Sequence, residues 1–111
     1  MAMQGNIMNR LAENSKSDII PEIGMGATGY MYSDRVAGTV IEIKAKNRIV
    51  VQEDDCKMEP WPSGYAVEGS YTRNPAGRTW ELIKTKRGWK VVGRGMRFRL
   101  GRRDAYTDPS F

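Results

Sequence analysis

The sequence contains no histidine and a single cysteine, Cys56, among its 111 residues. Without histidine, Ser-His-Asp and Cys-His catalysis are excluded, and so are metal sites built on imidazole. One cysteine forms neither an intrachain disulfide nor a thiolate zinc site, so the chain suits a reducing compartment. We therefore expect a protein that is not an enzyme and that needs no cofactor and no metal.

Long apolar runs are also missing. No stretch approaches the roughly 18 residues of a membrane span, and the first residues lack the basic start and apolar core of a signal peptide. We expect a cytoplasmic protein without a membrane partner. Leu, Ile, Val and Phe together supply only 20 residues, so the core must also use Trp, Met and Tyr.

Charge is distributed unevenly along the chain. The formal net charge is +5, but residues 1–70 carry −3 and residues 71–111 carry +8. Because opposite charges attract, a polyanion is expected to bind the second part.

The length allows one compact domain. Residues 1–18 form a polar segment, extended or with a short helix that Asn6 would cap, and residues 19–111 form a single domain with a tail at 104–111. Short β-rich runs separated by turn residues predict an all-β barrel, SH3-like or alternatively OB-like with Greek-key closure. The predicted strands span residues 27–32, 38–44, 48–53, 66–72, 78–85, 89–93 and 96–100.

Alternation of apolar residues predicts the core. Thr39, Ile41 and Ile43 should share one face of a hairpin that turns at residues 45–47. Further turns are expected at 74–77 and 86–88, and Pro60 and Pro62 predict a loop from 54 to 64. The predicted core comprises Ile41, Ile43, Val51, Trp80, Leu82, Trp89 and Phe98.

Residues 24–29 match the pattern G-x-G-x-x-G. A dinucleotide site needs a helix after this motif. The following Tyr30-Met31-Tyr32-Ser33-Asp34 favours a strand and a turn instead, so we interpret the glycines as the entry to the first strand.

Residues 26–53 resemble a KOW-type element of an SH3-like barrel, with a strand start at 26–28, a turn at 33–35 and Gly38 before the hairpin. KOW modules bind RNA or protein, so the resemblance implies a binding module. Ala37 stands where the family usually has a basic residue.

The whole chain also resembles small proteins encoded by bacteriophages and other mobile elements. Four segments carry this resemblance: residues 32–35, 38–40, 71–78 and 100–111. It implies a phage-type protein in the cytoplasm of a bacterial host, and it brings no established activity.

The segment 93–103 contains five arginines and is the strongest candidate for a binding site. On a strand, Arg97 and Arg99 would project to one face about 6 to 7 Å apart, while Phe98 and Leu100 face the core. Guanidinium groups suit bidentate phosphate contacts. The candidate nucleic-acid or partner-binding residues are Lys84, Lys86, Arg87, Arg94, Arg97, Arg99, Arg102 and Arg103. The alternative is a solvated edge strand whose charge prevents aggregation.

Two aromatic residues are candidates for stacking on bases, Trp61 and Tyr71. For Trp61 we favour a lid over one end of the barrel. The carboxylates at 53–55, with Glu59, and the pair Asp104 and Asp108 lack metal-loop spacing, and we interpret them as solvated loop charge. Phe111 is expected to dock on the barrel or on a partner chain.

These features predict a non-enzymatic phage-type protein that binds nucleic acid through phosphates. The alternative is an inhibitor of a host defence or regulatory system that binds a host protein or sequesters a nucleotide signal. A virion or assembly component is a third hypothesis, and a homo-oligomer is compatible with each.

Overall fold

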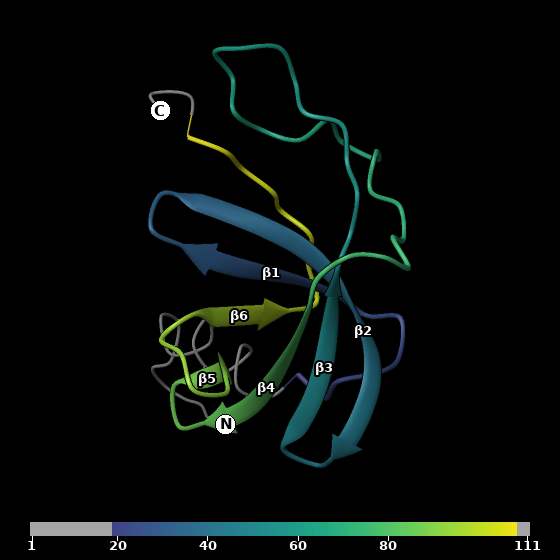
Figure 1. The fold of residues 1–111 in the computed structure, drawn as a ribbon, viewed down its shortest axis with the longest axis vertical. Coiled ribbons are helices and arrows are strands. Elements are labelled where there is room, and N and C mark those ends of the chain that lie inside the picture. The colour runs from purple at the N-terminus through teal and green to yellow at the C-terminus, as the bar shows by residue number, and fades with distance from the viewer. Residues whose placement is uncertain (1–18, 109–111) are drawn as a thin grey trace, which may run out of the picture.

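The computed structural model describes residues 19–108, which form one closed antiparallel barrel (Figure 1). Each strand pairs with its neighbour in sequence, and β6 closes the barrel on β1. The small all-β barrel is therefore confirmed, with consecutive strand order. The strands are β1 (Gly26–Met31), β2 (Asp34–Ala45), β3 (Arg48–Glu53), β4 (Thr79–Thr85), β5 (Gly88–Val91) and β6 (Arg97–Leu100).

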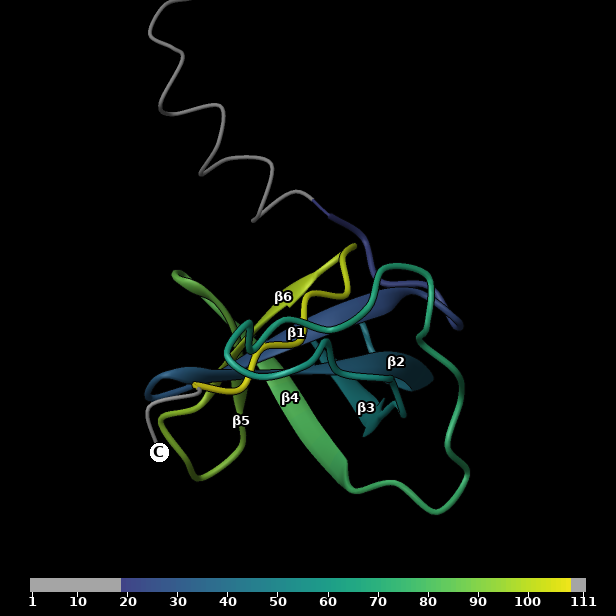
Figure 2. The same ribbon diagram turned by 90° about the horizontal axis from the view of Figure 1, so that it is seen from above.

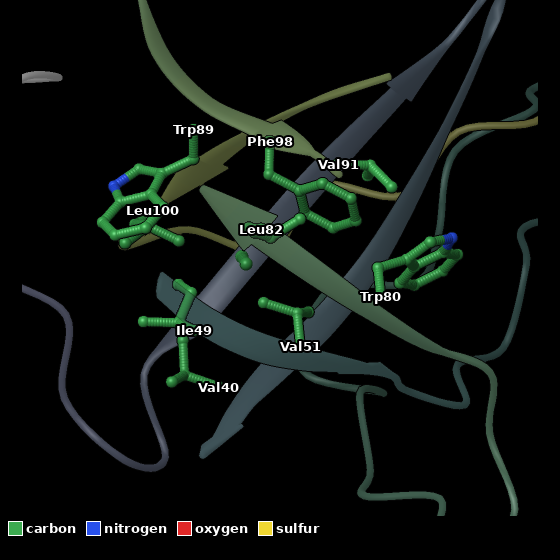
Figure 3. Packing of buried hydrophobic residues seen from close by; sticks show 10 residues of the cluster. Val40, Ile49, Val51, Trp80, Leu82, Trp89, Val91, Phe98 and Leu100 are labelled. Atoms are coloured by element: carbon green, nitrogen blue, oxygen red, sulfur yellow. The ribbon is translucent and has the colours of Figure 1, made fainter. Parts of the chain in front are cut away.

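The core lies inside the barrel and includes both tryptophans that the sequence assigned to it. Trp80 is 8% exposed and Trp89 is 2% exposed. Figure 3 shows them at opposite ends of the apolar cluster, with Phe98 and Leu82 between them. Large aromatic side chains thus compensate for the scarcity of aliphatic residues.

The predicted alternation along β2 is wrong, because a β-bulge interrupts it. Val40 lies opposite Val51 and Ile43 lies opposite Ile49, with a register shift between them at Ile41. Residues three apart face opposite sides of a regular strand, and the extra residue of a bulge restores a common face. Ile41 is therefore only half-buried, and Ile43, at the strand's end, is 40% exposed.

The segment between β3 and β4 is one long loop, residues 54–78, which projects from the barrel (Figure 1). The strand predicted at 66–72 does not form. Ala66 and Thr72 make only isolated bridges, to Met58 and Asp55. Large apolar side chains of the loop stay exposed, among them Met58, Tyr65 and Val67. Hairpin-like contacts within the loop replace a ladder on the barrel. The expected turn at 74–77 is confirmed, since the Gly77 N–H donates to the Asn74 carbonyl over 2.9 Å.

The C-terminal segment runs back along this loop (Figure 2). The Arg35 N–H donates to the Tyr106 carbonyl over 2.7 Å, and the Ala66 N–H donates to the Ala105 carbonyl over 3.3 Å. Loop and tail therefore form a second layer at one end of the barrel. The helix proposed near Asn6 and the docking of Phe111 lie outside the described residues.

Residues 19–108 contain no helix that could span a bilayer.

Candidate nucleic-acid interface

The arginines of β6 lie on the outer face of the barrel, as the alternation predicted. Phe98 and Leu100 are 5% and 4% exposed and belong to the core. Arg99, between them, is exposed, and Arg97 is half-buried. Successive residues of a strand point to opposite faces, so the burial of the two apolar residues places both guanidinium groups outside.

These two arginines share a pocket with a third, Arg87 of the β4–β5 turn. The pocket has a volume of about 210 Å³. It lies where the pairing of β5 with β6 stops, since the ladder comprises only Trp89 with Phe98 and Lys90 with Arg97. Its lining is formed by Tyr30, Arg87, Gly88, Trp89, Arg97, Phe98, Arg99 and Leu100. No carboxylate is among these residues, so the site favours an anion.

Two residues of this surface were not proposed from the sequence, Tyr30 and Lys90. Tyr30 on β1 and Lys90 on β5 are the cross-strand neighbours of Arg97 on its two sides. Tyr30 is 43% exposed. Lys90 alternates with the buried Trp89 and Val91, and that signal could have placed it on the outer face. The position of Tyr30 depends on the closure of β1 against β6, to which no local pattern points.

Arg103 lies apart from this surface, in a buried polar network. Its Nε donates to Asp54 Oδ2 over 2.7 Å, and its Nη2 donates to Thr39 Oγ1 over 2.9 Å. Thr39 Oγ1 in turn donates to Asp54 Oδ1 over 2.7 Å. The Asp54 side chain is only 2% exposed, so interpreting it as solvated loop charge was wrong. Arg103 compensates a buried carboxylate.

The remaining candidates are distributed over several places. Arg94 lines a different hollow, with Arg78 and Trp80. Tyr71 shares a third one with Arg103, and its hydroxyl oxygen accepts from the Ala105 N–H over 2.9 Å. Lys84, Lys86 and Arg102 are exposed. The basic residues therefore do not form one continuous face.

Trp61 is 79% exposed near the tip of the long loop, so the expected lid is wrong. Pro60 and Pro62 flank it, and neither can donate a backbone hydrogen bond to a strand. The loop therefore holds Trp61 outside the barrel.

Ion pairing separates structural cations from those left for a partner. Within residues 19–108, the five ion pairs engage Arg35, Lys44, Arg48, Arg78 and Arg103. None of these pairs involves Arg87, Arg97 or Arg99. The pocket arginines thus keep their charge uncompensated by a carboxylate.

The carboxylates of residues 53–55 lie near the single thiol, that of Cys56. Across the described part of the chain, no three metal-ligating side chains of the His, Cys, Asp or Glu type converge. Desolvation raises the pKa of the Cys56 thiol above 9.0, and the nearby Asp55, Asp54 and Glu53 add to the rise. Because the thiolate is the nucleophilic form, this environment disfavours it.

Comparison of the chain with protein-family models, with curated proteins and with solved structures found no match.

Proposed function

We propose that this chain is a non-enzymatic protein that binds nucleic acid through phosphate contacts with Arg87, Arg97 and Arg99. The observation that carries the proposal is the convergence of these three arginines, from a turn and from β6, on one pocket without a carboxylate. Each guanidinium presents donors in a planar fork that matches phosphate oxygens. We call this set the β6 arginine surface.

Spacing along β6 supports a polyanion as the ligand. Side chains two residues apart on a strand are separated by about 6 to 7 Å, which is close to the distance between successive phosphates of an extended strand. Lys90, beside Arg97, adds a further positive charge to the same face. Contacts of this kind are made to the backbone, so the protein would have little sequence preference.

Exposed aromatic rings beside the arginines favour a single strand. Tyr30 lines the pocket, and Tyr32, two residues on at the tip of the β1–β2 hairpin, is fully exposed. Base stacking on such rings contributes about 1–3 kcal/mol per base and tolerates any sequence. Both tyrosines serve this role better than Tyr71, whose hydroxyl anchors the tail.

Sequestration of a nucleotide signal is the second candidate. The presence of a pocket favours it, because binding a polyanion on a flat surface needs no cavity. Binding of a host protein, and the resemblance to phage-encoded and KOW-type proteins, stay predictions from the sequence.

Salt dependence tests the main proposal. Binding of a fluorescent oligothymidylate, followed by anisotropy, should weaken as salt rises, with a log-log slope of about −0.7 per phosphate contact. Arg99→Gln should weaken binding and reduce that slope by about one contact. Lys46→Gln removes the same charge from the β2–β3 turn and should leave the slope unchanged. Equal effects of the two variants, or no binding by the wild-type protein, would overturn the proposal.

A further inference from the structure

Two buried side-chain donors have no hydrogen-bond partner within residues 19–108, and both come from residues that line the same pocket. They are Trp89 Nε1 and Arg97 Nη1. Trp89 is 2% exposed. In Figure 3 its indole nitrogen lies on the side of the ring away from Phe98 and Leu82, so the core residues do not face it.

A buried donor without an acceptor is unusual and costly. Most buried polar atoms in proteins are paired, and leaving one unpaired costs about 1–3 kcal/mol, more for a charged group. Indole and guanidinium groups are donors only. A ligand that satisfies both donors must therefore present acceptor atoms, and a negative charge on it would balance that of the guanidinium.

The end of the β5–β6 ladder explains why a core residue and an outer-face residue line one pocket. Trp89 pairs with Phe98 and Lys90 with Arg97, and beyond them Arg87 and Gly88 face Arg99 and Leu100 without ladder pairing. Such an end leaves room between the strands for a group from outside. Arg87 and Arg99, both exposed, stand at its rim.

We infer that this pocket is a specific seat for one phosphate group. Its oxygens accept from Trp89 Nε1 and Arg97 Nη1, and Arg87 and Arg99 balance the charge at the rim. This inference rests on the proposed function, because it names the part of the β6 arginine surface that holds a phosphate.

The pocket is small, which suits a phosphate group better than a large ligand. A water molecule occupies about 30 Å³ in the liquid, and pockets for drug-sized ligands start near 300 Å³. The 210 Å³ here accommodates a phosphate and its attached sugar, with Tyr30 as a wall for the base. In a longer strand the neighbouring nucleotides would lie outside this pocket.

The indole resonances provide a test that needs no mutation. The chain has three tryptophans, which give three indole N–H peaks in a ¹⁵N-correlated spectrum. Titration with inorganic phosphate should shift the Trp89 peak in a saturable, one-to-one manner. The Trp80 peak, from the other end of the core cluster, should stay within error and serves as the internal control (Figure 3). No shift of Trp89, or equal shifts of both, would overturn the inference.

A matched pair of variants tests the arginine. Arg97→Lys and Arg94→Lys both keep the net charge, but only Arg97 lines this pocket. Arg97→Lys should weaken phosphate binding about tenfold, and Arg94→Lys should leave it unchanged within twofold. Trp89→Phe removes the indole donor, and thermal unfolding of that variant shows whether it keeps the fold. Equal losses in the two lysine variants would contradict the assigned seat.

The source of the phosphate is distinguished by three further probes: a nucleoside 5′-monophosphate, an oligothymidylate with a 5′-phosphate, and the same oligothymidylate without it. If the Trp89 peak shifts only with probes that carry a terminal phosphate, the seat binds a phosphate monoester. If it shifts with all three probes, the seat also binds the phosphates of the strand backbone. If oligothymidylate binds with the expected salt slope while the Trp89 peak does not move with any probe, the seat is refuted and the proposed function stands. If nothing binds, both are refuted.

Discussion

Arginine serves two purposes in this chain, and its surroundings decide which. Arg103 neutralises the buried Asp54 and also donates to Thr39. Arg97 is half-buried with one nitrogen unpartnered, and Arg99 is exposed beside it. Arg97 and Arg99 line the pocket and Arg103 does not, although all three have the same chemistry.

The backbone packs so closely around Gly38 that a hydrogen fits there but a side chain does not. A Cβ at Gly38 would lie 2.7 Å from the Gln52 carbonyl oxygen and 2.7 Å from Val51 Cγ1. Gly38→Ala should therefore destabilise the fold by about 1–3 kcal/mol through overpacking, as measured by urea denaturation. Gly95→Ala, whose Cβ would meet nothing within 4 Å, should change stability by less than about 0.5 kcal/mol. A similar loss in both variants would show that close packing at Gly38 is not the cause.

At the scale of elements, three neighbouring strands are joined on their outer face by charge. Glu81 of β4 accepts from Arg48 of β3, and Lys44 of β2 lies 3.5 Å away. The hydrogen bond from Arg48 is the main reason why the pKa of Glu81 lies below 4.5. Desolvation opposes this shift, and the charges of Lys44 and Arg48 lower the pKa further. This cluster supports the register of strands that the bulge in β2 otherwise perturbs.

The lowered pKa of Glu81 has a defined consequence for stability. The folded protein binds a proton at Glu81 less readily than the unfolded chain, so the contribution to stability is present above the unfolded value near 4.5. It is lost as pH falls through the lower folded value. Arg48→Gln should raise the pKa of Glu81 toward 4.5, as followed by NMR titration of its carboxyl carbon.

Arg78→Gln is the control for this titration, because Arg78 pairs with Glu53 instead. It should leave the pKa of Glu81 unchanged. A Glu81 that titrates at its ordinary value in the wild-type protein would show that the cross-strand pair does not persist in solution.

At the scale of the whole molecule, the barrel carries a second layer built from loop 54–78 and the tail (Figure 2). The ring of Tyr106 packs at a tilt of 56° against that of Tyr65, with centroids 4.8 Å apart, and the Arg35 guanidinium lies 5.1 Å from the Tyr106 centroid. The layer is thus held by a few polar and aromatic contacts, while the barrel is held by its core. Such a layer should open more easily than the barrel.

Tyr71 provides the test of this layer. Tyr71→Phe removes the acceptor for the Ala105 N–H, and Ala105 is 6% exposed. An unsatisfied buried donor costs about 1–3 kcal/mol. Hydrogen exchange at the Ala105 amide should accelerate about tenfold or more, while the amides of β3 and β4 keep their protection. The Tyr65 hydroxyl makes no hydrogen bond within residues 19–108, so Tyr65→Phe should leave the exchange rate of the Ala105 amide unchanged. An equal acceleration in both variants would contradict the role of Tyr71 as the anchor.

Local sequence patterns predicted much of the fold. Alternation along β6 placed Phe98 and Leu100 inside and Arg97 and Arg99 outside, because the side-chain period of a strand is two. Turn residues located the β4–β5 hairpin at Lys86 and Arg87. The strand predicted at 66–72 failed, because its residues make only isolated bridges and no neighbouring segment extends this pairing into a ladder.

The sequence by itself determined the class of fold, the tryptophan-rich core and the excess of positive charge in the second part of the chain. Period, turn chemistry and composition are local properties, so they can be obtained without knowing which segments meet. Only the tertiary structure decided that Arg87, Arg97 and Arg99 share a pocket with Tyr30, whereas Arg103 is committed to Asp54. Both outcomes depend on closure of the barrel between β1 and β6 and on the path of the long loop. Such contacts join residues far apart in sequence, and no local pattern encodes them.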